Sequence, residues 1–147
     1  MPQGNVEVVR RVFKFAQEGL RRGDHRAAFD EGVAAGVLSP SLEWRAGARG
    51  GVGVAGIRDA VGREGYVQFT RTWTEDFEEF QMEPEEIVDA GADGVAVVVH
   101  QRAIGKGSGA AVDMRASMIL VLESACVVRI DVFLDSTTAF KAAGLRQ

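Results

Sequence analysis

The spacing of apolar residues near the start of the chain predicts two helices. Between residues 5 and 21, apolar side chains recur every three or four positions while charged side chains occupy the other side, which is typical of an amphipathic helix. The apolar positions are Val9, Val12, Phe13, Ala16 and Leu20. Asn5 is a candidate N-cap, and Gly23 is a candidate stop. Asp24 is placed to cap a second, shorter helix that contains Phe29.

A stripe of aromatic residues predicts a third helix, from about residue 63 to residue 79. The members of the stripe are Tyr66, Phe69, Trp73, Phe77 and Phe80. Ser39-Pro40 predicts a break, and residues 42–46 predict a short strand after it, with Leu42, Trp44 and Ala46 on one face. The glycine-rich stretch 47–62 predicts a loop with one helical turn near Ile57.

The last third of the chain predicts an antiparallel sheet. Because Pro84 cannot donate to a ladder, residues 80–89 predict an edge strand or an irregular one. Residues 94–104, 111–122 and 127–134 predict three further strands, which are joined by turns at 105–109 and at Ser124-Ala125. A final helix is predicted from Asp135 or Ser136 to Gly144. Helices followed by a meander define an α+β fold.

Counting residues along the strands predicts which side chains share a face, because alternate residues of a strand point to opposite faces. The even positions of 112–122 and 127–134 are all apolar, and the odd positions are mixed. A hairpin centred on Gly107-Ser108 pairs Gln101 with Met114 and places Gln101 on the apolar face. The mixed face then holds His100, Arg102, Asp113, Arg115, Arg129 and Asp131.

Composition narrows the class of protein. The chain has 147 residues, 46% hydrophobic and 26% charged, which fits one globular domain over residues 1–147. A net charge of −4 argues against binding to nucleic acid, and no apolar run reaches the roughly 18 residues of a membrane span. Cys126 is the single cysteine, which excludes an internal disulfide. We expect a cytoplasmic protein without a metal or cofactor and without a signal peptide.

Several short motifs occur in an order that resembles a known family. They are Arg22-Gly23-Asp24, Leu42-Glu43-Trp44, the aromatic run ending in Trp73-Thr74-Glu75-Asp76-Phe77, Val127-Val128-Arg129, Phe133-Leu134-Asp135 and Ala142-Ala143-Gly144-Leu145. Together they resemble the SnoaL-like (polyketide cyclase-like) branch of the nuclear transport factor 2-like superfamily, over nearly the whole chain. The resemblance implies a cone-shaped, curved antiparallel sheet on three to four helices, with a pocket between them. It also implies a homodimer through the outer face of the sheet.

The resemblance leaves the function open, because its members include cyclases, isomerases, epoxide hydrolases, dehydratases and binding-only modules. Enzymes of the superfamily place acid–base groups on the inner face, for example on the last strand, where this chain has Val132. On the first strand it has Trp44 and Ala46. Gln101 is the only polar side chain of strand 94–104 that we expect on the inner face.

The leading hypothesis is a pocket for a small hydrophobic molecule, since aromatic and methionine side chains suit an apolar cavity. The predicted ligand-binding residues are Trp44, Tyr66, Phe69, Trp73, Gln101, Met114, Met118, Ile130 and Val132. One alternative is a cofactor-free acid–base enzyme, an isomerase, cyclase or dehydratase, that uses His100 with Asp113 or Asp131 if a bulge turns them inward. Another is a non-catalytic dimerisation module with a filled core.

Three further features have simpler interpretations. His25 follows the Asp24 cap and is expected in a solvated first helical turn. Gly105-Lys106-Gly107-Ser108-Gly109 lacks the spacing of a phosphate-binding loop and predicts a hairpin turn. Cys126 is expected to be a small structural hydrophobe.

Overall fold

The computed structural model describes residues 2–46, 60–91 and 93–133. The described part contains three helices, α1 (Pro2–Arg22), α2 (His25–Ala34) and α3 (Gly62–Thr74). Its strands are β1 (Leu38–Ala46), β2 (Ala60–Val61), β3 (Phe77–Gly91), β4 (Gly94–Gly105), β5 (Ala111–Glu123) and β6 (Cys126–Phe133). The helical turn predicted near Ile57 and the helix predicted over 135–144 lie outside the described residues.

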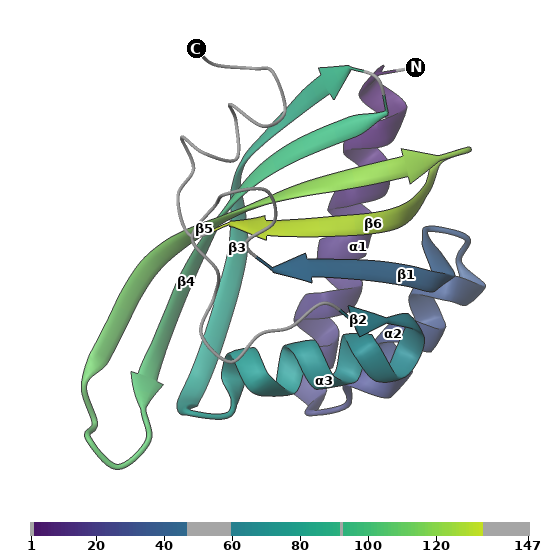
Figure 1. Ribbon diagram of the computed structural model, residues 1–147. Helices are drawn as coiled ribbons and strands as arrows, with labels where there is room; N and C mark the ends of the chain where they lie inside the picture. Colours follow the sequence, from purple (N-terminus) through teal and green to yellow (C-terminus); the bar gives the residue numbers. More distant parts are fainter. Residues whose placement is uncertain (1, 47–59, 92, 134–147) are drawn as a thin grey trace.

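The strands form one curved, unclosed sheet in the order β2-β1-β6-β5-β4-β3 (Figure 1). Strands β3 to β6 form the predicted antiparallel meander, with β3 at the edge as expected from Pro84. The sheet is mixed rather than wholly antiparallel, because β1 runs parallel to β6. Both strands begin at the same end: Leu38 pairs with Val127, and the Val127 amide donates to the Val37 carbonyl at 2.9 Å.

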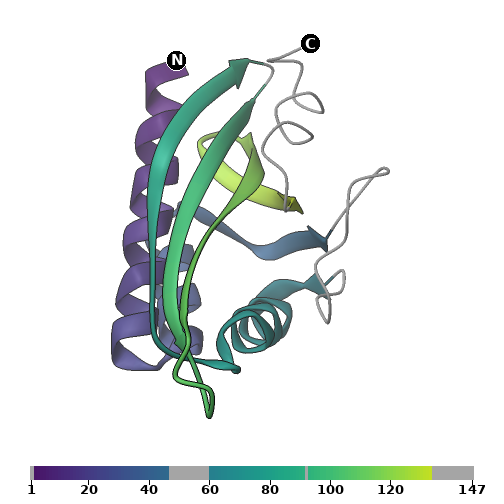
Figure 2. The same cartoon turned by 90° about the vertical axis from the view of Figure 1, so that its left-hand side faces the viewer.

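The local signals that begin and end α1 and α2 behave largely as predicted. Gly23 adopts a positive φ of 68° just after α1, and the Asp24 carboxylate accepts from the Ala27 amide at 3.0 Å. This is an N-cap hydrogen bond, and α2 begins directly after it. Helix α1 begins at Pro2, before the predicted cap at Asn5. In Figures 1 and 2, α1 runs along the bowed strands for most of its length.

Other element boundaries also differ from the prediction, and β2 lies within the stretch 47–62 that was predicted as a loop. Helix α3 ends at Thr74, so Phe77 and Phe80 belong to β3 although they continue its aromatic spacing. Pairing with the end of β4, where Phe77 lies opposite Gly105, overrides the local helical pattern. Strand β1 also begins before the predicted break and includes Pro40. The pairing of β1 with β6 is interrupted between Leu38 and Glu43, and a proline is tolerated at such an irregularity.

The inner face of the sheet packs against the helices and forms the core. The predicted register is confirmed, since Gln101 pairs with Met114. One face assignment is wrong: Val127, not Val128, contributes to the core. Leu122 pairs with Val127 while Val121 pairs with Arg129, so Val128 is the extra residue of a β-bulge. The turn before it has positive φ at both Ser124 and Ala125, as the tight turn of a hairpin requires.

Candidate functional site

A cavity of about 60 Å³ lies between α1, α3 and the inner face of the sheet. Its walls are almost entirely apolar, with aromatic and methionine side chains from several elements. Of the predicted ligand-binding residues, those that line it are Trp44, Tyr66, Phe69, Gln101, Met118 and Ile130. Val132 is buried in the core without lining the cavity, and Met114 is partly exposed. The side chain of Trp73 lies outside the described part.

Three aromatic rings build one side of the cavity. Trp44 of β1 stacks on Phe69 of α3 with ring centroids 4.0 Å apart, and it meets Tyr66 in a tilted arrangement at 5.7 Å. Phe29 of α2 supports Tyr66 from behind, at 5.3 Å. Burial raises the pKa of Tyr66 to about 12, so its hydroxyl stays protonated at any physiological pH. The helices and β1 therefore join around a neutral aromatic wall.

Gln101 is the buried polar side chain at this site. It lies in β4 between Met82 of β3 and Met114 of β5, and only 2% of its surface is exposed. Neither Nε2 nor Oε1 has a hydrogen-bond partner among the described residues, and the same is true of the Trp44 indole nitrogen. Buried polar groups are hydrogen-bonded in the great majority of cases, so two unpaired groups lining one cavity are unusual.

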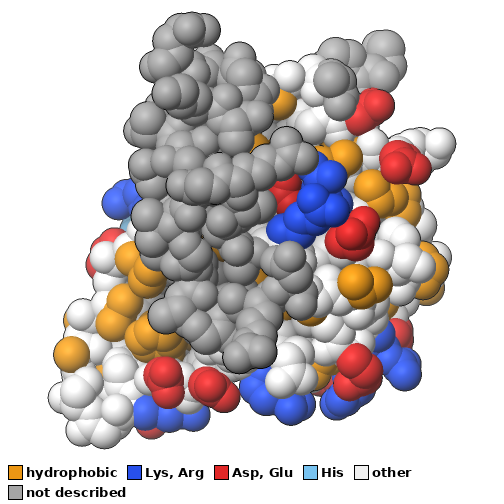
Figure 3. Space-filling view, in the orientation of Figure 1, with side chains coloured by type: hydrophobic (Ala, Val, Ile, Leu, Met, Phe, Trp, Pro, Cys, Tyr) orange, Lys and Arg blue, Asp and Glu red, His pale blue; other side chains and the backbone are white. Residues whose placement is uncertain are grey.

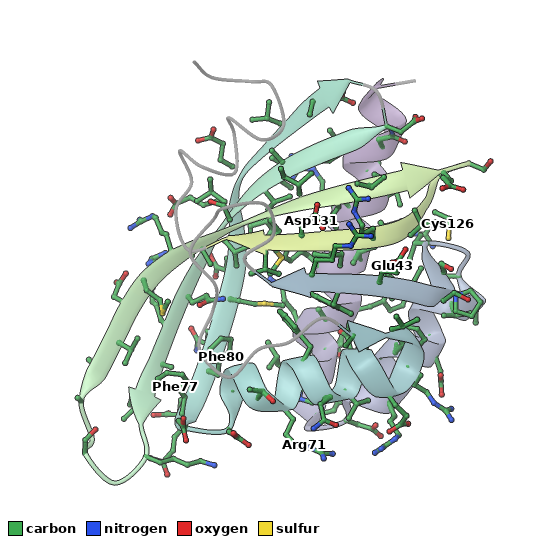
Figure 4. All side chains as sticks on the ribbon, in the orientation of Figure 1. Glu43, Arg71, Phe77, Phe80, Cys126 and Asp131 are labelled. Carbon is green, nitrogen blue, oxygen red and sulfur yellow. The ribbon has the colours of Figure 1, made fainter. Side chains whose placement is uncertain are left out.

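The cavity adjoins a larger groove of about 950 Å³ between the end of α1, the start of α2, the end of α3 and the start of β3. The residues that line both, and so define the neck between them, are Leu20, His25, Thr74, Phe80 and Met82. The Gln17 amide donates to the Met82 carbonyl at 2.9 Å and fixes α1 against β3 at this point. Figure 4 shows Phe77 and Phe80 near the start of β3 beside α3, with Arg71 on α3 itself.

His25 occupies the neck, which corrects the expectation of a solvated residue. It is half-buried, and desolvation, with a smaller contribution from the Arg71 guanidinium, lowers the pKa of its imidazole. The nearby Asp24 opposes this shift. No periodic pattern marks this position, because the place of His25 depends on how α1 and α2 meet. Its neutral imidazole is an uncharged polar group at the mouth of the cavity.

The catalytic candidates lie on the other face of the sheet. His100 Nε2 is 2.7 Å from Asp113 Oδ1, and His100 Nδ1 is 3.6 Å from Glu85. Arg115 makes two hydrogen bonds to the same Glu85, at 2.8 and 3.0 Å. The His100 hydrogen bond lowers the pKa of Asp113. The β4–β5 register is continuous through these residues, so no bulge there turns them inward.

Asp131, the third catalytic candidate, does not join His100 in this cluster. Its carboxylate lies 3.2 Å from the Nε of Arg129, two residues earlier on β6 (Figure 4). The structure therefore brings His100 together with Asp113 and Glu85 and gives Asp131 a different partner. Within 2–46, 60–91 and 93–133, no group of three or more His, Cys, Asp or Glu side chains is arranged to hold a metal.

Ion pairs join α2 and α3 on the remaining polar surface. Figure 3 shows acidic and basic side chains side by side along the lower rim, over α2 and α3. Arg26 of α2 binds Glu64 of α3 at 2.7 Å, and Arg63 lies 3.4 Å from Asp30.

Cys126 is half-buried. Desolvation is the first cause of the raised pKa of its thiol, which makes the thiol a weak nucleophile. No helix in the described part is long and apolar enough to span a membrane.

Comparison with solved structures identifies the fold. The chain superposes on a protein named as a SnoaL-like polyketide cyclase from Jannaschia sp. CCS1 with a TM-score of 0.66 and 20% identity, over 99% of this chain and 94% of that one. A nuclear transport factor 2-like protein of unknown function from Burkholderia pseudomallei K96243 gives 0.62 and 18%, over 94% and 95%. TerC, co-crystallised with polyporic acid, gives 0.64 and 17%, over 96% and 98%.

These similarities, together with the curved sheet and the helices around it, define an α+β protein with the nuclear transport factor 2-like fold. The structural neighbours include SnoaL-like members, as the order of sequence motifs predicts. No family model matches the sequence, and no curated protein matches it. At this level of identity the likeness shows the fold, and the function has to be argued from the site.

Proposed function

We propose that this protein binds a small, predominantly apolar molecule in the cavity between α1, α3 and the sheet. The observation behind the proposal is an apolar, aromatic-walled cavity that adjoins an open groove through a defined neck. Ligand sites are typically concave and mostly apolar, with a few polar groups that orient the ligand. Gln101, Trp44 and the His25 imidazole are such groups at this site.

The size of the cavity restricts how a ligand would bind. Ligand pockets commonly measure about 300–1,000 Å³, and an engineered cavity of about 150 Å³ holds benzene. The cavity here is about 60 Å³, which accommodates one end of a molecule and not a polycyclic body. The rest of the ligand would pass between Phe80 and His25 and lie in the groove of about 950 Å³. The core is thus neither completely filled nor open enough to enclose a large molecule.

The structural neighbours support a small-molecule role. TerC was co-crystallised with polyporic acid, and the Jannaschia protein is named as a polyketide cyclase. A catalytic role for His100 with Asp113 or Asp131 has weaker support, because these side chains lie on the outer face, away from the cavity. The homodimer through that outer face stays a prediction, which sedimentation of the Arg115→Glu variant against the wild-type chain would test.

The binding proposal is tested by filling the cavity. Ala16 lines it from α1, whereas Ala34 is exposed at the end of α2, so Ala16→Phe and Ala34→Phe are matched helical substitutions. N-phenyl-1-naphthylamine is a neutral fluorescent probe whose phenyl end would enter the cavity while its naphthalene lies in the groove, and we expect saturable binding to the wild-type chain and to Ala34→Phe. We expect binding to Ala16→Phe to weaken at least about tenfold, equivalent to about 1.4 kcal/mol. Equal binding by all three chains, or none by the wild type, would contradict the proposal.

A further inference from the structure

We infer that the ligand enters the cavity with an uncharged head group that both accepts and donates hydrogen bonds, such as a primary carboxamide, a lactam or an un-ionised acid. This inference rests on the proposed function and specifies the chemistry of the ligand. Gln101 presents two N–H donors and an acceptor oxygen, and none of them is satisfied by the described residues. Because both ends of the amide are unpaired, exchanging its oxygen and nitrogen would not change this conclusion.

A second donor lines the same cavity. The indole N–H of Trp44 can only donate, and it too is buried without a partner among the described residues. Stacking on Phe69 and contact with Tyr66 fix the plane of the indole, so its N–H has a fixed direction. A carbonyl oxygen in the cavity could accept from Gln101 and from Trp44, while an N–H or O–H of the same head group donates to Gln101.

The threonine hydroxyl groups of the α3 wall already have partners. Thr70 Oγ1 donates to the Tyr66 carbonyl at 2.9 Å, and Thr74 Oγ1 donates to the Thr70 carbonyl at 2.8 Å. These bonds stay within α3 and use the one proton that each hydroxyl can donate. Gln101 and Trp44 are the buried polar groups of the cavity that lack a partner among the described residues, and we expect them to bind the head group.

The charge of the lining excludes an ionised head group. The described residues around the cavity include no Lys, Arg, Asp or Glu, and the lowered pKa of His25 favours the uncharged form of the imidazole at the neck. A carboxylate inside would lose its water without gaining a counter-charge, which is costly in a dry site. The basic side chains of Arg71 and Lys106 line the outer groove and not the cavity.

Three matched molecules test the inference: 3-phenylpropanamide, 4-phenylbutan-2-one and 3-phenylpropanoate. They share a phenyl body and differ in whether the head group donates and accepts, only accepts, or is ionised. By NMR titration at neutral pH, with displacement of N-phenyl-1-naphthylamine to place binding in the cavity, we expect the amide to bind about tenfold more tightly than the ketone. An unpaired buried polar group costs enough to produce such a difference. We expect the carboxylate to bind more weakly than both.

Two variants assign the selectivity to residues. Gln101→Met keeps the volume and removes the amide, so the preference for 3-phenylpropanamide over the ketone should disappear. Trp44→Phe removes a donor to the carbonyl together with one ring of the indole, and because both losses affect the amide and the ketone alike, the two should weaken together by a similar factor. Without ligand, Gln101→Met should have a higher melting temperature, because it replaces an unsatisfied buried polar group with an apolar one.

The results separate the two proposals. Absence of N-phenyl-1-naphthylamine binding would overturn the proposed function itself. If that probe binds and Ala16→Phe abolishes its binding, but the three matched molecules bind alike, the cavity binds ligands and the inference about the head group is wrong. A lower melting temperature of Gln101→Met, with the amide preference retained, would also overturn the inference.

Discussion

Phe77 and Phe80 lie with their ring centroids 6.0 Å apart, although residues three apart in a regular strand point to opposite faces. The reason is a β-bulge: Glu78 pairs with Ile104 and Gln81 with Arg102, so β3 contains one extra residue at this point. Glu79 takes the strained position, with a φ of 52°. The bulge brings Phe80 to the neck of the cavity while Phe77 lines the groove.

This geometry predicts opposite effects for two substitutions at Glu79. Glycine adopts positive φ without the steric cost of a Cβ atom, so Glu79→Gly should leave the free energy of unfolding unchanged or raise it by up to about 1 kcal/mol. Glu79→Val should lower it by about 1–3 kcal/mol, because a β-branched residue is poorly suited to this conformation. Urea denaturation measures both values. A Glu79→Gly chain less stable than Glu79→Val would show that the backbone is not strained there.

The close contact between α1 and α2 predicts that Gly19 cannot be replaced freely. A Cβ atom on Gly19 would lie 2.7 Å from the Cβ of Ala28, closer than real contacts allow. Gly19→Ala should therefore destabilise the protein, although alanine favours helices by about 1 kcal/mol. The matched control is Gly4→Ala in the exposed first part of the same helix, which should be neutral or slightly stabilising. Thermal unfolding of both variants checks the prediction, and equal gains in melting temperature would contradict it.

The turn between β5 and β6 offers a stabilising substitution. Ala125 has a φ of 63°, a conformation that glycine adopts more readily than alanine. Ala125→Gly should raise the free energy of unfolding by about 0.5–1 kcal/mol, because relief of the steric strain exceeds the added freedom of the unfolded chain. Ala110→Gly, in the exposed end of the other hairpin, is the control and should not stabilise. Chemical denaturation that ranks the two variants the other way would count against this explanation.

The position of His25 predicts a dependence of stability on pH. Desolvation lowers the folded-state pKa of His25 below the unfolded value, which is about 6.5. The unfolded chain then binds the proton more readily, so this contribution is fully present above pH 6.5 and is lost as the pH falls through the folded pKa. His25→Asn should lose less stability than the wild type between pH 7 and pH 5. Melting temperatures across that range test this, and parallel curves for the two chains would refute it.

The lowered pKa of Asp113, on the outer face of the sheet, predicts a second dependence of stability on pH. The hydrogen bond from His100 lowers the pKa of Asp113, so its stabilising contribution is present above the unfolded carboxyl pKa and is lost as the pH falls through the folded one. Asp113→Asn should be less stable than the wild type near pH 6, and the two should converge in acid. Asp93→Asn, at an exposed carboxylate in the turn before β4, is the control. A difference between wild type and Asp113→Asn that persists undiminished at low pH would contradict the assignment.

Local patterns along the chain were enough to predict the meander and its faces. A glycine turn centred on Gly107-Ser108 predicted the pairing of Gln101 with Met114. Alternation in β5 assigned its apolar side to the core, because a slip of one residue would have exposed that side. The cap at Asp24 and the positive φ at Gly23 are equally local. For the same reason the aromatic members of the cavity wall, Tyr66 and Phe69, were identifiable from helical spacing.

Features that depend on where separate segments meet could not be predicted from local patterns. The parallel pairing of β1 with β6 and the end of α3 at Thr74 follow from strand contacts between residues far apart in the sequence. The bulge at Val128 depends on how β6 pairs with β5 beyond their turn. His25 lines the site because α1 and α2 pack together at the mouth of the cavity, and this cavity is formed by several segments of the chain. Periodicity reports which face of an element is buried. The volume enclosed, and which polar groups remain unpaired inside it, are set by how those faces come together.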